Sequence, residues 1–265
     1  MSADFDSAAI SYDNEFTHTA VGKLQRNRVW KYLSPIVEVK SRLNILEINC
    51  GTGEDAIQLG TKGHQVLATD ISEGMLKAIA EKVKRHHLQD SINTKPLSIQ
   101  QLNQLEKNQF DLIFSNFGGL NCISPEEFQQ FATTTEQLLN SGGKAVLVIM
   151  PRFTLIETLY FLLKLKFSRA FVRRKKGSTP IIVNGTTVDT WYYSAKKMNQ
   201  FFASKSMLIN KVKPIGIFLP PSYLNPFFEK HPLLLNFLNT LEKLFGEIGW
   251  LVYASDHYLI ELEKK

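Results

Sequence analysis

The sequence has few residues that build disulfide or metal sites, and it lacks a long apolar run. Its two cysteines, Cys50 and Cys122, can form neither a disulfide framework nor a zinc site by themselves. They fit a reducing cytoplasm, where we expect the protein to be located. The most apolar stretch, residues 153–167, is short for a bilayer span and carries Glu157 and two lysines. We therefore expect no transmembrane segment, and the acidic N-terminus does not resemble a signal peptide.

Charge of one sign does not dominate either. The net charge of +6 is mostly scattered along a chain whose charged fraction, 21%, is ordinary for a soluble globular protein. The one dense basic cluster, residues 173–176, is typical of a solvated face. We therefore do not expect nucleic acid as a partner. Transient contact of residues 153–176 with a membrane remains an alternative.

Strand-like and helix-like segments alternate through residues 43–150. This alternation predicts an α/β fold with a doubly wound, mostly parallel, seven-stranded sheet and helices on both faces. We expect four parts, which are an N-terminal helical cap (1–42), a Rossmann-like core (43–150), a lid or substrate-binding insertion (151–253), and a final strand that completes the sheet (254–265).

Three local signals refine this expectation. Helical spacing of apolar residues predicts a helix over 20–33 that Pro35 closes. The apolar segment 153–167 predicts a cover helix. The pair Asn184-Gly185 predicts a type I′ hairpin turn between two strands.

The segment LEINCGTGEDA, residues 46–56, has a glycine loop but no lysine. A nucleoside triphosphate loop requires that lysine, so this ligand class is excluded. The dinucleotide fingerprint is matched by Gly51, Gly53 and Ala56. An acid after the second strand, Asp70, fits an adenosine ribose in sites for NAD and for S-adenosylmethionine (SAM) alike.

Acidic residues around the loop favour one of these two ligands. Glu54 and Asp55 stand at the helix start, where a pyrophosphate needs positive potential. Glu47 ends the preceding strand, and a carboxylate there suits a ligand that bears an ammonium group and a sulfonium. SAM has both groups and NAD has neither, so the acids favour SAM.

The segments LEINCGTGEDA and GHQVLATDISEGML together resemble the first two SAM-binding motifs of class I methyltransferases. The resemblance is to the small-molecule branch that includes ubiquinone, menaquinone and biotin pathway enzymes. It extends to FDSAAISYDNEF near the N-terminus and to FDLIFSNFGGLNCI, and so covers roughly residues 5–150. The sequence departs from the family pattern at Asn49, where glycine is common, and near Ser98, where an acid is common.

The resemblance implies a role for each matching residue in binding SAM, whose product is S-adenosylhomocysteine. The methionine end of SAM would be lined by Glu47, Asn49, Cys50, Gly51 and Gly53, with Tyr12 and Arg28 closing over its carboxylate. Asp70 would accept both ribose hydroxyls. The adenine would be flanked by Ile71 and Met75, with Ser98, Ile99 and Gln100 at its edge. The sulfonium side would be covered by Asn116, Phe117 and Gly118.

Residues after 150 offer candidates for contact with a methyl acceptor. These are Tyr192 and Tyr193, and His257 as a general base at the start of the last strand. The aromatic and leucine-rich second half favours a small apolar or aromatic acceptor and, slightly, O-methylation. An NAD(P)-dependent oxidoreductase and a non-catalytic SAM-binding partner protein are the alternatives. We expect no metal, and a monomer or a homodimer.

Overall fold

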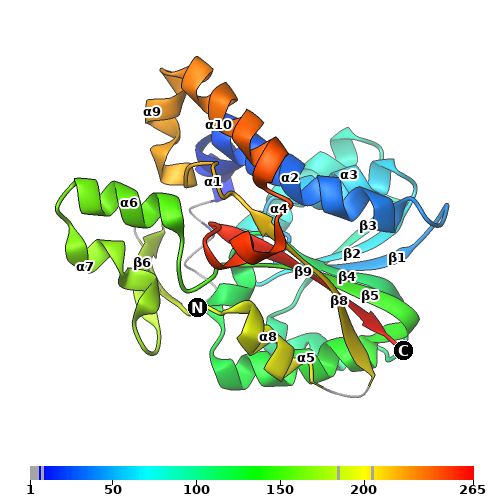
Figure 1. Ribbon diagram of the computed structural model, residues 1–265. Coiled ribbons are helices and arrows are strands. Elements are labelled where there is room, and N and C mark those ends of the chain that lie inside the picture. The colour runs from blue at the N-terminus through cyan, green and yellow to red at the C-terminus, as the bar shows by residue number, and fades with distance from the viewer. Residues whose placement is uncertain (1–5, 7–8, 184–185, 204–205) are drawn as a thin grey trace.

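A single large sheet organises the molecule (Figure 1). The structure is a computed structural model that describes residue 6 and residues 9–265, apart from 184–185 and 204–205. The strands of the large sheet are β1 (Asn44–Ile48), β2 (Gln65–Asp70), β3 (Ile92–Pro96), β4 (Phe110–Ser115), β5 (Leu139–Ile149), β8 (Met207–Ile215) and β9 (His257–Lys264). Their order is β3-β2-β1-β4-β5-β9-β8, and only β9 runs antiparallel to its neighbours. The predicted seven-stranded, mostly parallel sheet is confirmed.

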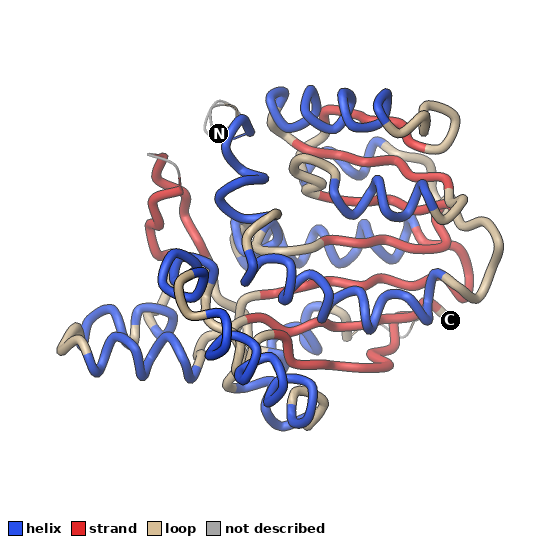
Figure 2. Tube along the Cα trace, turned by 90° about the horizontal axis from the view of Figure 1, so that it is seen from above, coloured by secondary structure: helices blue, strands red, loops and turns tan. Residues whose placement is uncertain are grey.

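Helices cover both faces of this sheet, as Figure 2 shows from above. One face packs against α2 (Ala20–Val37), α3 (Glu54–Thr61) and α4 (Glu73–Arg85), and the other against α5 (Pro125–Leu138) and α8 (Ala195–Phe201). Strands β1, β4 and β5 are buried on both faces because their apolar residues do not alternate with polar ones. Two separate hydrophobic cores result, one on each side of the sheet.

The remaining elements are short or lie outside the core. Short helices α1 (Ala9–Tyr12) and η2 (Asp13–Thr17) precede α2, and η3 (Ile99–Gln104) and η4 (Gly119–Cys122) flank β4. After β5 come α6 (Leu155–Leu163), α7 (Phe167–Ala170), η5 (Val172–Arg174) and a hairpin of β6 (Thr179–Val183) and β7 (Thr186–Thr190). Between β8 and β9 lie η6 (Ser222–Leu224), α9 (Asn225–Glu229), α10 (Pro232–Phe245) and η7 (Gly249–Tyr253). The predicted turn at Asn184-Gly185 lies outside the described residues.

Two predicted boundaries are corrected by the structure. Helix α2 continues through Pro35 to Val37, because Ile36 and Val37 are buried in the core and this burial outweighs one lost backbone hydrogen bond. The range 151–253 is not one insertion, since β8 within it pairs with β9 as the edge strand of the core sheet. Two separate segments therefore leave the sheet, one from α6 to β7 before β8 and one from η6 to η7 after it. We call them the two excursions.

Candidate active site

The glycine loop after β1 adopts a backbone that few side chains tolerate. Asn49, Gly51 and Gly53 have positive φ angles of 54°, 53° and 78°. Asparagine is one of the residues that enters this left-handed region readily, which explains how Asn49 stands where glycine is common. The loop also holds its shape through Gly53, whose N–H donates to the carbonyl of Cys50 at 2.9 Å. The result is a tight strand-to-helix turn between β1 and α3.

The Asn49 side chain requires a glycine on the opposite loop. A Cβ added to Gly119 would lie 2.3 Å from Asn49 Nδ2 and 2.6 Å from Asn49 Cβ. Because the Cβ of Asn49 is itself in the way, a change of rotamer cannot relieve the contact. Asn49 Nδ2 is buried and has no hydrogen-bond partner among the described residues.

We therefore expect Gly119→Ala to lower the free energy of unfolding by about 1–3 kcal/mol, the usual cost of overpacking. The added Asn49→Gly substitution removes the obstructing side chain and should restore most of that loss. Urea denaturation of the two single variants and the double variant measures this coupling. Gly249→Ala is the control, since a Cβ there meets no atom within 4 Å. Purely additive effects in the double variant would contradict the contact.

Asp70, at the end of β2, is tied to the glycine loop. Its carboxylate oxygens accept from the N–H of Gly51 and of Ser72, each at 2.9 Å. Burial raises the pKa of the Asp70 carboxyl, whereas these two N–H groups act to lower it. The acid thus has a positioning task within the protein in addition to the role predicted from the sequence.

The residues predicted around an adenine lie beside the end of β2. Ile71 is partly exposed, whereas Met75 is buried at the start of α4, where Ser72 Oγ caps its N–H. Leu97 N–H donates to the carbonyl of Asp70, which brings Ser98 and the buried Ile99 close to that strand. The Gln100 side chain instead donates to Glu127 at 2.8 Å.

Glu47 is a buried carboxylate without a full set of partners. It is 2% exposed, and Oε2 forms no hydrogen bond among the described residues. Burial, and then the charge of Asp55, raise the pKa of the Glu47 carboxyl well above its ordinary value, and the charge of Asp70 adds to this effect. An unsatisfied buried acid of this kind is costly in the free protein, and a cationic group beside it would offset the cost.

Asp55, the second residue of α3, is contacted by three donor side chains. Arg26 forms an ion pair with it, Trp30 Nε1 donates at 2.7 Å, and Asn116 Nδ2 donates at 2.9 Å. Glu54 lies beside Lys82, with 3.3 Å between Oε2 and Nζ. The acids at the helix start are therefore paired within the protein, and their repulsion of a pyrophosphate is weaker than the sequence alone indicated.

Arg28 does not reach this loop, which corrects the role predicted for it. Its guanidinium is buried on the other side of α2, 3.8 Å from Glu242 of α10 and 5.0 Å from the Tyr32 ring. Residues 26 and 28 point to different sides of a helix, because two positions correspond to about 200° of rotation. The arginine of α2 that lies beside the start of α3 is Arg26, which pairs with Asp55.

Aromatic rings connect the N-terminal helices to the start of β9. The rings of Tyr12 and Phe16 are 5.6 Å apart, Phe16 packs on Phe117, and Phe117 packs edge-to-face on His257 with centroids 5.4 Å apart. Tyr12 also lies over the loop, since its Cε1 is 4.0 Å from a Cβ added to Gly51. Burial raises the pKa of Tyr12 to about 12. These contacts place Tyr12, Phe117 and His257 in one chain of packed rings.

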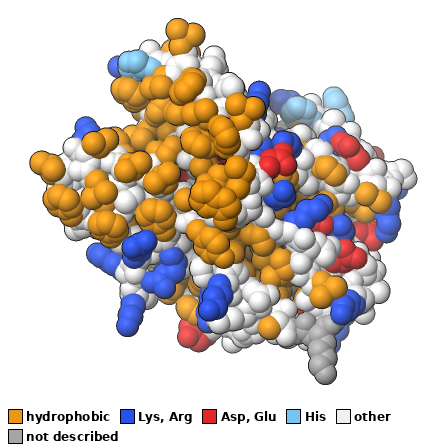
Figure 3. All heavy atoms as spheres, in the orientation of Figure 1, with side chains coloured by type: hydrophobic (Ala, Val, Ile, Leu, Met, Phe, Trp, Pro, Cys, Tyr) orange, Lys and Arg blue, Asp and Glu red, His pale blue; other side chains and the backbone are white. Residues whose placement is uncertain are grey.

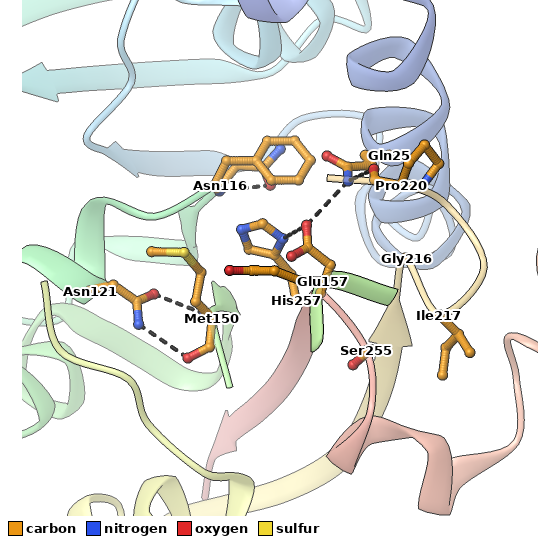
Figure 4. A network of polar contacts seen from close by, with 12 residues as sticks. Gln25, Asn116, Asn121, Met150, Glu157, Gly216, Ile217, Pro220, Ser255 and His257 are labelled. Carbon is orange, nitrogen blue, oxygen red and sulfur yellow. Dashed lines mark hydrogen bonds and ion pairs between the residues drawn. The ribbon is translucent and has the colours of Figure 1, made fainter. Parts of the chain in front are cut away.

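His257 is backed by a buried network of charges (Figure 4). Its Nδ1 is 3.1 Å from Asp256 Oδ2, and Gln25 Nε2 donates to that same oxygen at 3.2 Å. Arg173 Nη2 donates to Asp256 Oδ1 at 2.7 Å and to Glu157. Burial acts to raise the pKa of Asp256, but the charges of His257 and Arg173 outweigh it and hold the pKa well below its usual range. The solvated position predicted for Arg173 is wrong, because its side chain is buried in this network.

The two tyrosines predicted to contact a substrate lie in different parts of the structure. The Arg173 guanidinium lies 5.4 Å from the Tyr192 ring, beside the charge network. Tyr193 is buried in the core, packs on Phe128 and Phe201, and donates its hydroxyl to the carbonyl of Ile123. This placement corrects the catalytic role predicted for Tyr193, since its hydroxyl is already committed within the core.

The sequence analysis also placed Cys50 and Gly118 at the site. Cys50 is buried, and burial raises the pKa of its thiol well above the ordinary value, which disfavours the thiolate. Gly118, with a φ of 83°, begins the turn after β4, where Asn116 Oδ1 accepts from the Phe117 N–H.

Several residues at the site were missed. Arg26 and Trp30 share one face of α2 at a spacing of four, which is a signal that a helix-face analysis could have found. Asp13 accepts from Thr52 Oγ1 at 2.6 Å and pairs with Lys82, and Asp6 accepts from Ser72. No local sequence signal marks these last two contacts, because they join an N-terminal segment to distant loops.

Comparison with known proteins agrees with this geometry. Residues 45–143 match the family described as methyltransferase domain. The chain is 29% identical over 149 residues to the demethylmenaquinone methyltransferase of Bacteroides fragilis, an alignment that covers 54% of this chain and 57% of that protein. The chain thus spans little more than half the length of this curated relative.

Two solved structures share the fold over most of the chain. A SAM-dependent methyltransferase of Listeria monocytogenes, itself assigned provisionally, aligns with a TM-score of 0.60 at 15% identity over 92% of this chain and 99% of that one. Geranyl diphosphate C-methyltransferase of Streptomyces coelicolor, solved with S-adenosylhomocysteine, aligns with a TM-score of 0.59 at 8% identity over 91% of this chain and 78% of that one. At these identities the likeness concerns the fold. In its sheet order, its glycine loop and its matched residues 45–143, the chain is similar to SAM-dependent methyltransferases.

Proposed function

We propose that this protein transfers a methyl group from SAM to a small apolar or aromatic acceptor, with oxygen as the favoured atom. The observation that carries the proposal is the buried carboxylate of Glu47, whose Oε2 has no partner among the described residues. It lies at the end of β1, directly before the glycine loop. A cationic ligand fits there, and the matched family uses one.

The residues that would hold SAM follow from their places. Glu47 and the loop of Asn49 to Gly53 would face its methionine end, with Tyr12 above them. Asp70 retains lone pairs for the ribose hydroxyls although it accepts two N–H groups. Residues 71 and 98–99 would lie at the adenine, and Asn116 to Gly118 would lie at the sulfonium. Arg26 is added to the set, because it lies beside Asp55 and 5.6 Å from the Phe117 ring.

When bound, SAM supplies a methyl carbon on a good leaving group, so the protein needs to position the acceptor and exclude water. Phe117 covers one side of the site and contacts His257. We infer that His257 accepts the proton of an acceptor hydroxyl. Asp256 Oδ2 lies 3.1 Å from Nδ1 and would orient the ring, which leaves Nε2 for the acceptor.

Aromatic residues near the charge network support an apolar acceptor. Tyr223 stacks on Phe161 with centroids 6.3 Å apart. The charges of Glu157, Asp256 and Arg173 all affect the pKa of Tyr223, which burial raises most. With Tyr192, these rings would form an aromatic wall around the acceptor. An oxidoreductase or a non-catalytic partner protein has no comparable support.

A transfer assay tests this function. The protein is incubated with SAM labelled in its methyl group and with an organic-solvent extract of the source cells. We expect label to enter an organic-soluble product only when the protein is present. Absence of transfer to phenols, carboxylic acids and the extract alike would count against the proposal.

Binding of SAM is expected to release a proton from Glu47. Its raised pKa means that Glu47 keeps its proton to a higher pH than an ordinary glutamate does, and a nearby cation favours the ionised form. The affinity for SAM should therefore increase as the pH rises, until Glu47 is already ionised in the free protein. Calorimetry in buffers of different ionisation enthalpy measures the released proton.

The Glu47→Gln variant has no proton to release, so its affinity should lose this pH dependence. Glu54→Gln is the matched control, since Glu54 is a more exposed acid beside the same loop and pairs with Lys82. Equal proton release from wild type and Glu47→Gln would show that the acid does not face the cation.

A further inference from the structure

One face of the molecule exposes an unusual number of large apolar side chains (Figure 3). It covers α6, α7, α9, α10 and η7, and we call it the apolar face. Its most exposed members are Leu159, Leu163, Leu165, Phe167, Phe227, Leu233, Phe237, Leu244, Trp250 and Tyr253. Scattered apolar residues on a surface are ordinary, but a gathered set of this size marks an interaction surface.

Helix α10 exposes several apolar side chains to solvent and buries an acidic one. Its exposed positions include Leu233, Phe237 and Leu244, while the acid Glu242 is buried. Glu242 is held there because its carboxylate accepts from the backbone N–H groups of residues 216–218, each at 2.9 Å. These three charge-assisted bonds fix the helix orientation. The outward direction of the apolar side is therefore built into the fold.

Basic side chains border this face. Between residues 152 and 182 the one acid is Glu157, which is buried against Arg173. The exposed charged residues of this range are all basic, namely Arg152, Lys164, Lys166, Arg169, Arg174, Lys175 and Lys176. Figure 3 shows Lys and Arg side chains gathered along the lower edge of the apolar region on the side of α6 and α7. We call these seven residues the basic rim.

We propose that the apolar face and the basic rim together dock the protein on an anionic lipid bilayer. Exposed leucine, phenylalanine and tryptophan beside lysine and arginine is the combination that inserts into the headgroup region of a membrane. Each basic residue near an anionic surface adds attraction. Within the described part of the chain, no helix is both long and apolar enough to cross a membrane, so the contact is with one leaflet.

Charge favours a bilayer over a second copy of this chain as the occupant. A two-fold contact would place the apolar face of one copy on the same face of the other, which needs acids there to meet the basic rim. Of the acids beside the face, Glu242 is buried, Glu247 pairs with Lys31, and the exposed Glu229 of α9 accepts from Asn225, so they are too few to meet the seven residues of the basic rim. The phosphates of anionic lipids provide that negative charge continuously.

Docking in this orientation has a consequence for catalysis, which rests on the proposed function. Tyr223 and Phe161, which stack beside the network of Glu157 and Arg173, belong to the same two excursions as the apolar face. An apolar acceptor dissolved in the bilayer would then reach the site without crossing water. Vesicle binding itself does not depend on this step, so it can be tested without methyl transfer.

Vesicle flotation of the full chain tests the docking. We expect binding to phosphatidylcholine vesicles that contain about 30% phosphatidylglycerol, and much weaker binding to phosphatidylcholine alone. Binding should weaken when the ionic strength rises from about 0.05 M to about 0.5 M. A rim variant, Lys166→Glu with Lys175→Glu and Lys176→Glu, should lose about 100-fold or more in affinity.

A second variant changes the apolar face, with Leu163→Ser, Leu233→Ser and Phe237→Ser. It should also release the protein from anionic vesicles, and these exposed substitutions should leave the thermal midpoint almost unchanged. The matched control is Lys84→Glu with Lys95→Glu and Lys107→Glu, which makes the same charge change on exposed residues of α4, β3 and the loop before β4. The control variant should bind less well than wild type but far better than the rim variant.

Three results would overturn the proposal. One is that wild type does not float with anionic vesicles. Another is that the rim and control variants lose the same affinity. The third is a dimer in light scattering that the apolar variant dissociates while wild type fails to bind vesicles, which would assign the face to a second copy.

Discussion

Replacing Arg173 by methionine is expected to lower the free energy of unfolding by about 3–5 kcal/mol. The guanidinium donates to Glu157, to the Asp256 carboxylate and to the Asp256 carbonyl, all within a buried network. Methionine keeps most of the side-chain volume but removes the ion pair of the buried Glu157 and leaves the buried Asp256 with only His257 and Gln25 as side-chain partners. Urea denaturation at neutral pH measures the loss.

Arg174→Met is the matched control, because Arg174 is exposed, lies over the Phe153 ring and forms no ion pair with any residue that the structure describes. Its effect should stay below about 1 kcal/mol. The difference between wild type and Arg173→Met should shrink as the pH falls. Arg173 and His257 hold the pKa of Asp256 low, so the pairing adds stability above the ordinary aspartate pKa and loses it as the pH falls through the lowered value. Equal losses from the two arginine variants would contradict the buried network.

Replacing His257 by alanine should slow methyl transfer about 100-fold or more while SAM binds with nearly unchanged affinity. His257 contacts Phe117 and Asp256 and would act on the acceptor, whereas the proposed cofactor site lies at the loops after β1, β2 and β4. Single-turnover transfer from labelled SAM and calorimetry on the same variant separate the two effects.

The control for this experiment is His86→Ala, an exposed histidine at the end of α4. It should change neither transfer nor binding. If His257→Ala weakened SAM binding as strongly as transfer, the histidine would have a structural role and not that of a base.

The parts of the fold that could be predicted depend on residues that are close together in the sequence. The alternation of apolar strands and amphipathic helices over residues 43–150 gave the sheet, and the run from Glu47 to Gly53 marked the ligand loop. Asp70 could be placed because an acid that ends the second strand must lie beside the first strand in a parallel sheet. These inferences need only neighbouring residues and the rules of strand order.

The parts that could not be predicted depend on contacts between distant residues. Arg173 looked like one member of a solvated basic run, because its partner Asp256 is 83 positions away. Tyr192 and Tyr193 have the same local sequence context, and only the packing against Phe128 decides which ring enters the core. The orientation of α2 likewise decided between Arg26 and Arg28.

The structure also changes the reason for favouring SAM. Arg26 and Lys82 neutralise the acids at the start of α3, so those acids alone do not repel a dinucleotide. The unpaired oxygen of Glu47 is now the main electrostatic argument. It favours a cation at the end of β1, such as the ammonium or the sulfonium group of SAM.

Calorimetry of ligand-free protein with SAM, S-adenosylhomocysteine and NADH tests the central claim most directly. We predict micromolar binding of SAM and S-adenosylhomocysteine and no detectable binding of NADH. Binding of NADH without binding of SAM, or no binding of any of the three, would contradict the assignment of this loop to a sulfonium nucleoside.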